Sequence, residues 1–225
     1  MSDGKSKKNV VIFGTGSFAE VVKFYLTHDS EYKVIAFCAS ANAIVEDEYL
    51  GLPLVPFEEV EKIFHPDTCS MFIAIGYAQL NAVRARFFHE AKAKGYALIS
   101  YVSSKATHWG DTKFGENCFI FENNTIQPFV VIDNDTIVWS GNHIGHHTSI
   151  GAHCFITSHA VVSGHCSIGA YSFIGVNATI GDATTIGERN IIGPSALIQK
   201  NTGSDEVFLA ERTNKHLRES SRFFR

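Results

Sequence analysis

Residues 144–169 read IGHHTSIGAHCFITSHAVVSGHCSIG, in which a large apolar residue returns at every sixth position. The period runs from Phe114 to Ile198 without an insertion, and twelve of its fifteen apolar positions are isoleucine. A repeat this strict predicts short, equivalent turns of backbone that stack on one another. The residue four positions later is mostly small, and Gly directly follows eight of the fifteen. This pattern predicts a parallel β-helix of six-residue rungs, with apolar and small residues inward and glycine where the backbone turns.

The overall composition excludes several classes of protein. A chain of 225 residues, 45% of them hydrophobic, can bury the cores of two modest domains. The net charge of −4 argues against binding to nucleic acid or anionic membranes. No apolar run approaches the roughly 18 residues that cross a bilayer, and the polar start of the chain does not resemble a signal peptide. We therefore expect a cytoplasmic protein without nucleic-acid or membrane partners.

Three of the five cysteines, Cys118, Cys154 and Cys166, occupy the small inward position of a rung. A free thiol there behaves as a compact apolar group, so we expect packing rather than redox chemistry.

The first hundred residues lack the six-residue period and alternate between strand-like and helix-like segments. We expect strands over 10–13, 33–38, 71–75 and 97–102, and helices after residue 17 and over about 80–94. This alternation predicts a small Rossmann-like α/β domain with a parallel sheet. The expected division is therefore an α/β domain over 1–105, a β-helix over 106–203 and a tail over 204–225. We expect the tail either to cap the β-helix as a helix or to be partly disordered.

A glycine turn, Gly14-Thr15-Gly16, joins the first strand to the first helix. This geometry can place a pyrophosphate on the N-terminus of a helix. A nicotinamide site would also need an acid at the end of the second strand, where this chain has Cys38. Two interpretations stay open: the glycines serve only a tight turn, or the domain binds a substrate that carries a nucleotide, which we favour.

Histidines gather in the segment Asn142–His147, where we expect His143, His146 and His147 to converge at one corner of the β-helix. Imidazole can take a proton from an amine or hydroxyl nucleophile, as acyl transfer requires. The competing interpretation is zinc binding, which would make the protein a hydratase of the β-helix type. Such an enzyme has no need for a nucleotide-type domain, so we expect no metal.

These features together resemble the bacterial nucleotide-sugar acyltransferases, the relatives of sialic-acid O-acetyltransferase and of the bacillosamine-pathway N-acetyltransferase. The resemblance covers roughly residues 8–203 and is carried by VIFGTG at 11–16, IAIG at 73–76 and IGHHTSIG at 144–151. It implies a homotrimer of left-handed β-helices with acetyl-CoA, the co-substrate, between adjacent subunits. The N-terminal domain would then hold the nucleotide sugar.

The resemblance also implies roles for individual residues. His146 matches the general base, and His147 stands where many members have an acid. The implied substrate contacts are Gly14, Thr15, Gly16, Ser17, Cys38, Gly76, Arg84, Asn142 and His143, with Arg84 as the partner of a phosphate. The implied acyl-CoA contacts are Phe155, Gly164, Gly175, Val176 and Pro194.

The function that the resemblance implies is N-acetylation of a nucleotide-linked amino sugar for surface-glycan synthesis, such as lipopolysaccharide O-antigen. Acetylation of a sugar hydroxyl and a non-catalytic, nucleotide-sensing scaffold stay open as alternatives.

Overall fold

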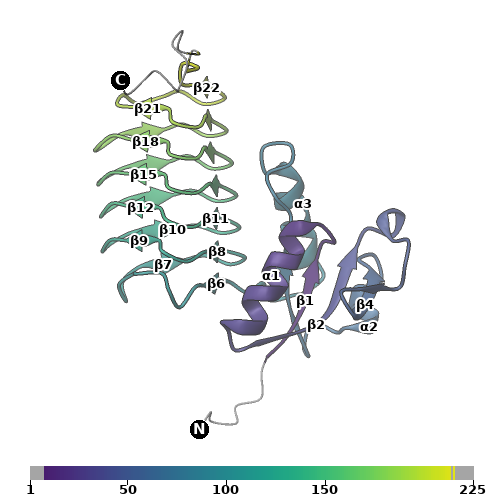
Figure 1. The fold of residues 1–225 in the computed structure, drawn as a ribbon. Helices are drawn as coiled ribbons and strands as arrows, with labels where there is room; N and C mark the ends of the chain where they lie inside the picture. Colours follow the sequence, from purple (N-terminus) through teal and green to yellow (C-terminus); the bar gives the residue numbers. More distant parts are fainter. Residues whose placement is uncertain (1–7, 214, 216–225) are drawn as a thin grey trace, which may run out of the picture.

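The computed structural model describes residues 8–213 and 215. Figure 1 shows an α/β domain beside the lower part of a columnar β-helix, whose last strands lie at the far end of the column. In this part of the chain, no helix is long and apolar enough to cross a bilayer.

The α/β domain is built on a five-stranded sheet with the order β3-β4-β2-β1-β5. Its strands are β1 (Lys8–Phe13), β2 (Tyr32–Ala39), β3 (Glu48–Tyr49), β4 (Leu52–Pro56) and β5 (Ser70–Ile73). Its helices are α1 (Ser17–His28), α2 (Val60–Ile63) and α3 (Ala82–Ala93), with a 3₁₀ turn, η1, over Ala41–Ala43. Strand β3 pairs antiparallel with β4, and the other pairs are parallel. The expected parallel α/β domain is confirmed.

The apolar run in β1 lies at the centre of this sheet and is buried on both faces, as expected for a central parallel strand. Val10 and Ile12 join one hydrophobic cluster, and Val11 and Phe13 join another. The chain then turns at Gly14, where φ is +121° and an added Cβ would lie 2.8 Å from the carbonyl oxygen of Ala74. Helix α1 begins three residues later, so its N-terminus opens at the carboxyl edge of the sheet.

Two-residue strands follow at six-residue intervals and form three parallel sheets. The domain-facing sheet contains β6 (Tyr101–Val102), β8 (Phe119–Ile120), β11 (Ile137–Val138), β14 (Phe155–Ile156), β17 (Phe173–Ile174), β20 (Ile191–Ile192) and β22 (Val207–Phe208). The β12 sheet contains β9 (Thr125–Ile126), β12 (His143–Ile144), β15 (Val161–Val162), β18 (Thr179–Ile180) and β21 (Leu197–Ile198). The β13 sheet contains β7 (Lys113–Phe114), β10 (Val131–Ile132), β13 (Ser149–Ile150), β16 (Ser167–Ile168) and β19 (Thr185–Ile186).

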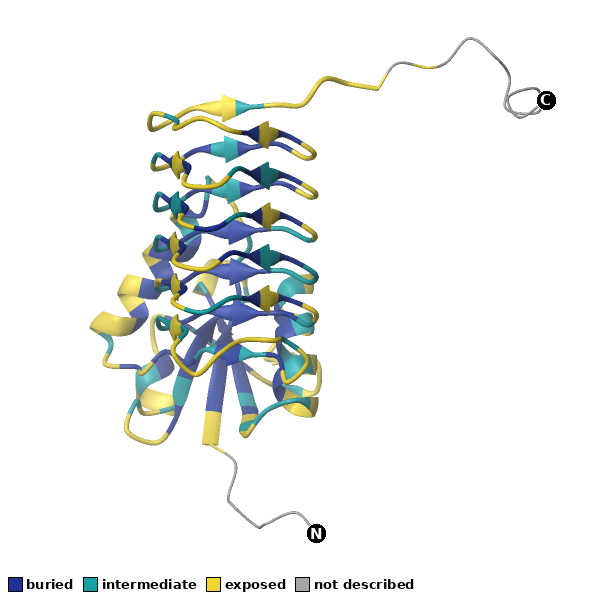
Figure 2. Ribbon diagram, turned by 90° about the vertical axis from the view of Figure 1, so that its left-hand side faces the viewer, coloured by how far each residue is buried: buried dark blue, intermediate teal, exposed yellow. Residues whose placement is uncertain are grey.

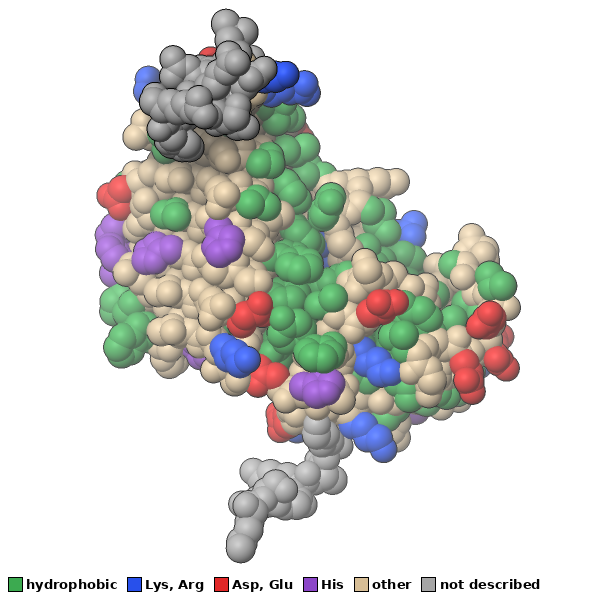
Figure 3. All heavy atoms as spheres, viewed as in Figure 1, with side chains coloured by type: hydrophobic (Ala, Val, Ile, Leu, Met, Phe, Trp, Pro, Cys, Tyr) green, Lys and Arg blue, Asp and Glu red, His purple; other side chains and the backbone are tan. Residues whose placement is uncertain are grey.

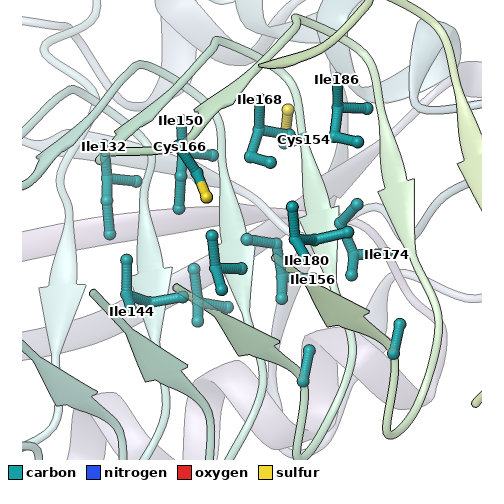
Figure 4. Close-up of a cluster of buried hydrophobic side chains, with 14 of the residues drawn as sticks. Ile132, Ile144, Ile150, Cys154, Ile156, Cys166, Ile168, Ile174, Ile180 and Ile186 are labelled. Atoms are coloured by element: carbon teal, nitrogen blue, oxygen red, sulfur yellow. The ribbon is translucent and has the colours of Figure 1, made fainter. Parts of the chain in front are cut away.

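Paired residues in these sheets are eighteen apart, as in Ile132 and Ile150, so three rungs make one coil. The expected left-handed β-helix is confirmed, and its apolar positions form one continuous core (Figure 4). Cys118, Cys154 and Cys166 are free thiols within that core. Burial raises the pKa of Cys118 and of Cys154 to about 12, which makes these thiols poor nucleophiles.

From Phe114 to Ile192, the backbone turns at the third residue after each apolar position, where φ is positive. Glycine fills this corner position at residue 141, but His147, His153, His159 and His165 occupy it elsewhere. The expectation that the glycine after the apolar residue makes the turn is therefore wrong for most rungs. That glycine instead permits close stacking, because a Cβ at Gly169 would lie 2.5 Å from the backbone nitrogen of Glu188 in the next coil. Figure 2 shows buried strands along the column and exposed residues at many of its edges.

Two expected boundaries differ from the structure. Of the expected strand over 97–102, Leu98 makes a single bridge to Met71, whereas Tyr101–Val102 pairs with β8 and starts the β-helix. At the other end, Val207–Phe208 pairs with β20 and extends the domain-facing sheet past residue 203. Residues 204–213 contain no helix. The rest of the expected cap, except for residue 215, lies outside the described residues.

The two domains share a hydrophobic core across the domain-facing sheet. Val10, Ile12 and Phe72 of the α/β domain belong to the same buried cluster as Phe119 and Ile137 of the β-helix. The domains therefore dock through packed side chains rather than through a solvated linker.

A fully buried ion pair crosses this interface. Arg84 of α3 and Asp135 of a β-helix corner are both 0% exposed, with 3.1 Å between Nε and Oδ1. Arg84 also donates hydrogen bonds to the carbonyl oxygens of Gly76 and Cys154. Asp135 also accepts a hydrogen bond from the side-chain amide of Asn117. Each buried charge thus has several partners, as a buried ion pair requires.

A second polar contact joins the end of α1 to the segment that enters the β-helix. The carboxylate of Asp29 accepts hydrogen bonds from the hydroxyl of Tyr101 at 2.6 Å and from the backbone N–H of Ser104 at 2.9 Å. Burial acts to raise the pKa of Asp29, but the hydrogen bonds from Ser104 and Tyr101 outweigh it and lower the pKa to about 2.

Replacing Arg84→Ala should lower the free energy of unfolding by about 3–5 kcal/mol, because it leaves the Asp135 carboxylate buried without its counter-ion. Arg86→Ala is the matched control, since Arg86 lies on the same helix with a side chain that is 62% exposed. Its effect should stay within about 0.5 kcal/mol. Urea denaturation measures both, and equal losses in the two variants would contradict the structural role of Arg84.

Replacing Asp29→Asn should lower the free energy of unfolding by about 1–2 kcal/mol at neutral pH, because the ionised carboxylate is the better acceptor. A depressed pKa contributes stability above the unfolded value of about 3.9, and that contribution disappears as the pH falls through the folded value. The difference between wild type and variant should therefore shrink between pH of about 4 and about 2. Glu31→Gln is the control, because Glu31 makes a surface ion pair with Lys8. A difference that does not depend on pH would contradict this account.

Candidate functional site

Three imidazoles meet at the corner between the β12 sheet and the β13 sheet. His146, His147 and His165 have ring nitrogens that all lie within 4.8 Å of one another, and all three residues are exposed. The Nδ1 atoms of His146 and His147 are 3.2 Å apart. The rings of His147 and His165 stack at 4.8 Å because these residues are one coil apart at the same corner position. Phe129, one coil before His147, packs on the latter's ring at 4.6 Å.

A glycine makes room for the ring of His146. Gly164 lies one coil beyond His146, and Asp182 one coil beyond Gly164. A Cβ on Gly164 would lie 3.0 Å from Nε2 of His146 and 3.2 Å from Oδ1 of Asp182. The imidazole edge and the carboxylate thus border the same small space. Sequence reasoning missed Asp182, although the eighteen-residue spacing could have revealed it.

The expected convergence of His143, His146 and His147 is correct for two of the three residues. His143 lies on strand β12, before the turn, and pairs with Val161, and the third member of the cluster is His165. Asn142 is buried and structural, since its Oδ1 accepts the N–H of Ala160 and its amide donates to the carbonyl oxygen of Trp139. The contact of Asn142 and His143 with a substrate stays a prediction.

The glycine turn lines a cleft of about 540 Å³ between the α/β domain and the β-helix. Five of the seven α/β-domain residues expected to bind substrate line it: Gly14, Thr15, Gly16, Ser17 and Gly76. The N-terminus of α1 opens into this cleft, which favours an anionic group through its free N–H donors and its dipole.

The other two expected contacts, Cys38 and Arg84, are not in the cleft. Cys38 is 0% exposed in the core of the α/β domain, where burial raises the pKa of its thiol. Arg84 is 0% exposed, and its guanidinium is committed to Asp135 and to backbone carbonyls. The expectation that Arg84 binds a phosphate is therefore wrong, because its donors already have partners inside the protein.

Sequence reasoning missed Trp139, which lines the cleft from the β-helix. Its ring stacks on Phe121 at 4.4 Å. Its indole N–H is buried and has no hydrogen-bond partner among the described residues. An unpaired buried donor costs free energy, so the contribution of Trp139 to the cleft comes from its ring.

The residues expected to contact acyl-CoA fall in three places. Phe155 lines the cleft, with its ring 5.0 Å from that of Tyr77. Gly164 lies beside His146 at the histidine corner. Gly175, Val176 and Pro194 follow β17 and β20, so they lie at the corner between the domain-facing sheet and the β12 sheet.

The cleft and the histidine corner lie on opposite sides of one protomer. The cleft adjoins the domain-facing sheet, whereas the histidines lie where the other two sheets meet. In a three-sided column, the corner between two faces is opposite the third. Figure 3 shows histidine side chains on the part of the β-helix away from the α/β domain, and a band of hydrophobic side chains between the domains.

Comparisons with known proteins agree with this architecture. Residues 9–91 match the PglD N-terminal domain, and residues 165–200 match the bacterial transferase hexapeptide (six repeats). No functionally curated protein matches the sequence significantly.

Several solved structures share the whole fold. PerB from Caulobacter crescentus, in complex with CoA and GDP-perosamine, is 24% identical with a TM-score of 0.79, over 88% of this chain and 92% of that one. The acetyltransferase domain of PglB from Neisseria gonorrhoeae is 22% identical with a TM-score of 0.77, over 86% and 92%. WeeI from Acinetobacter baumannii is 17% identical with a TM-score of 0.74, over 89% and 95%.

The resemblance expected from the sequence is thus confirmed: the chain joins a PglD N-terminal domain to a hexapeptide-repeat β-helix, the architecture of the nucleotide-sugar acyltransferases with a left-handed β-helix.

Proposed function

We propose that the protein transfers an acetyl group from acetyl-CoA to the amino group of a nucleotide-linked amino sugar, with His146 as the general base. The observation that carries the proposal is the presence, in one chain, of a glycine-lined cleft at a helix N-terminus and of exposed imidazoles on a hexapeptide β-helix. The similar solved structures add support. PerB is in complex with CoA and GDP-perosamine, and the PglB acetyltransferase domain has been solved with acetyl coenzyme A.

The cleft supplies what a nucleotide sugar needs. The diphosphate would lie on the N-terminus of α1, where Gly16 and Ser17 present backbone N–H groups. With Arg84 buried, charge recognition rests on these backbone donors.

The histidine corner supplies the proton chemistry. The sugar amine attacks the thioester carbonyl, a C–N bond forms, and His146 takes the proton that the amine loses. Collapse of the tetrahedral intermediate breaks the C–S bond, and the imidazolium returns the proton to the leaving thiolate. Asp182, beside the space at Gly164, would stabilise the imidazolium by its negative charge. Backbone N–H groups of neighbouring coils would stabilise the oxyanion. A hydroxyl acceptor would use the same base. We favour an amine acceptor over a hydroxyl acceptor because GDP-perosamine N-acetyl transferase is among the similar structures.

A homotrimer would complete the site. Since the cleft and His146 lie on opposite sides of one protomer, a closed ring of subunits would bring the histidine corner of one to the cleft of the next. Acetyl-CoA would then lie between them, near the corner of Gly175, Val176 and Pro194. In the cell, such an enzyme would serve the synthesis of surface glycans such as O-antigen.

Replacing His146→Ala should lower kcat by about 10²- to 10⁴-fold, since a positioned general base contributes about that much. The assay follows release of the CoA thiol with a panel of UDP-, dTDP- and GDP-linked amino sugars. His65→Asn is the control, because His65 is an exposed histidine of the α/β domain that belongs neither to the cleft nor to the cluster. A His146→Ala protein that kept the full rate would remove the proposed base.

Co-expression of two inactive variants tests the shared site. Gly16→Glu should block the cleft without strain, because φ at Gly16 is −94° and a Cβ there meets no atom within 4 Å. Its carboxylate would also repel a phosphate. Gly16→Glu and His146→Ala should each be inactive alone. Equal co-expression should restore about a quarter of the wild-type rate, since about a quarter of random interfaces pair an intact cleft with an intact His146. Mixed trimers without activity would place the whole site in one subunit.

A further inference from the structure

The histidine cluster has the composition and spacing of a transition-metal site. It offers three imidazole nitrogens and no carboxylate, a donor set that suits Zn²⁺, Co²⁺ or Ni²⁺ better than Mg²⁺ or Ca²⁺. With Zn–N bonds of about 2.0–2.1 Å, tetrahedral ligand atoms lie about 3.4 Å apart. The Nδ1 atoms of His146 and His147 are already 3.2 Å apart, and one ring nitrogen from each of the three histidines lies within 4.8 Å of the others. Rotation of one exposed ring about its side-chain bonds would bring the three nitrogens within bonding distance of a single ion.

A separate structural feature brings each of the three imidazole rings to this corner. The coil repeat stacks His165 on His147 with an angle of 16° between the rings, and Phe129 packs on the ring of His147. Gly164 leaves the space into which the ring of His146 extends. Because two stacked rings direct their in-plane lone pairs in parallel, His147 or His165 must rotate when the ion binds, and the exposure of both residues leaves room for that rotation.

The electrostatic surroundings also favour a cation. Asp182 borders the same space as the ring of His146 and forms no ion pair within the described residues. Its negative charge is therefore not neutralised by a lysine or arginine and adds to the attraction for a divalent ion.

We propose that His146, His147 and His165 of a single subunit bind one divalent transition-metal ion of the zinc class, and that the bound ion inhibits acetyl transfer. Three protein ligands leave a coordination position for water. A neutral imidazole that binds the ion through one ring nitrogen carries its hydrogen on the other, so a metal-bound His146 has no lone pair with which to act as the base. The binding site stands on the geometry alone, whereas the inhibition rests on the proposed function.

His165 separates the two roles because it belongs to the cluster and has no part in the proposed proton transfer. Its corner position has φ of 55°, which asparagine tolerates well, so His165→Asn removes a ligand without straining the backbone. His159→Asn is the matched control, with φ of 59° at an equivalent corner outside the cluster.

The experiment uses the full-length protein after removal of metal with a chelator, at mildly alkaline pH, because protons compete with metal ions for ligand nitrogens. Calorimetry with Zn²⁺ and visible spectroscopy with Co²⁺ report binding without reference to activity. We expect one ion per chain in the wild type and in His159→Asn, and affinity at least about tenfold weaker in His165→Asn. Each protein is compared with its own metal-free rate: Zn²⁺ should inhibit acetyl transfer by the wild type and by His159→Asn, whereas His165→Asn should resist Zn²⁺.

The outcomes are distinct for the two proposals. Absence of Zn²⁺ and Co²⁺ binding to the wild type, or equal losses of affinity in the two asparagine variants, would overturn the metal site. Acetyl transfer that Zn²⁺ leaves unchanged would overturn the inhibition while supporting the proposed function. Stoichiometric binding that depends on His165, in a protein that acetylates no sugar in the panel, would support the site and overturn the proposed function.

Discussion

Parallel hydrogen bonds between successive coils join each rung to the rung eighteen residues later, and most of the structure depends on that spacing. The N–H of Gly145, for example, donates to the carbonyl oxygen of Val162, and the N–H of Gly151 to that of Ile168. Because the coils from Phe114 to Ile198 keep this spacing in all three ladders, equivalent side chains of successive coils lie in register. The same constraint places His165 on His147, and Gly164 between His146 and Asp182. The geometry of the candidate site is thus a direct consequence of the backbone ladder.

The parts of the fold that could be predicted are those in which a short sequence pattern repeats along the chain. The six-residue repeat predicts the β-helix, its inward isoleucines and its buried cysteines, and the alternation of segments predicts the parallel sheet around β1. The glycine turn predicts where the cleft lies. Tyr101–Val102 could not be assigned to its sheet, because nothing local in that apolar segment shows where the chain leaves one domain for the other. Likewise, the burial of Arg84 follows from its pairing with Asp135, which is 51 residues away and belongs to a different domain.

The residues of the candidate site could be predicted where a reactive residue type occurs at a recognisable position of the repeat. They could not be predicted where contacts between distant segments determine whether a side chain is exposed. His146 and His147 stand out because adjacent imidazoles are uncommon. To predict that His165 joins them, one must know that residues eighteen apart stack on each other. To predict that Trp139 lines the cleft, one must know which sheet faces the α/β domain. Cys38 shows the opposite case, since its position after a central strand suggests a ligand contact while its side chain turns into the core. The buried pair of Arg84 and Asp135 adds specificity to the docking, because only one arrangement of α3 on the β-helix satisfies both charges.

The corners of the β-helix have a further consequence for how such a site can change. More than half of the corner positions from Asn117 to Ser195 hold Asn, Asp or His. Those residue types, together with glycine, tolerate the left-handed backbone that the corner imposes. They include the side chains that bind protons and metals. Exchange among them leaves the ladder intact, so the column can acquire, lose or move reactive groups along its edges without refolding. The edges are therefore the part of this architecture in which new chemistry can arise at the least cost in stability.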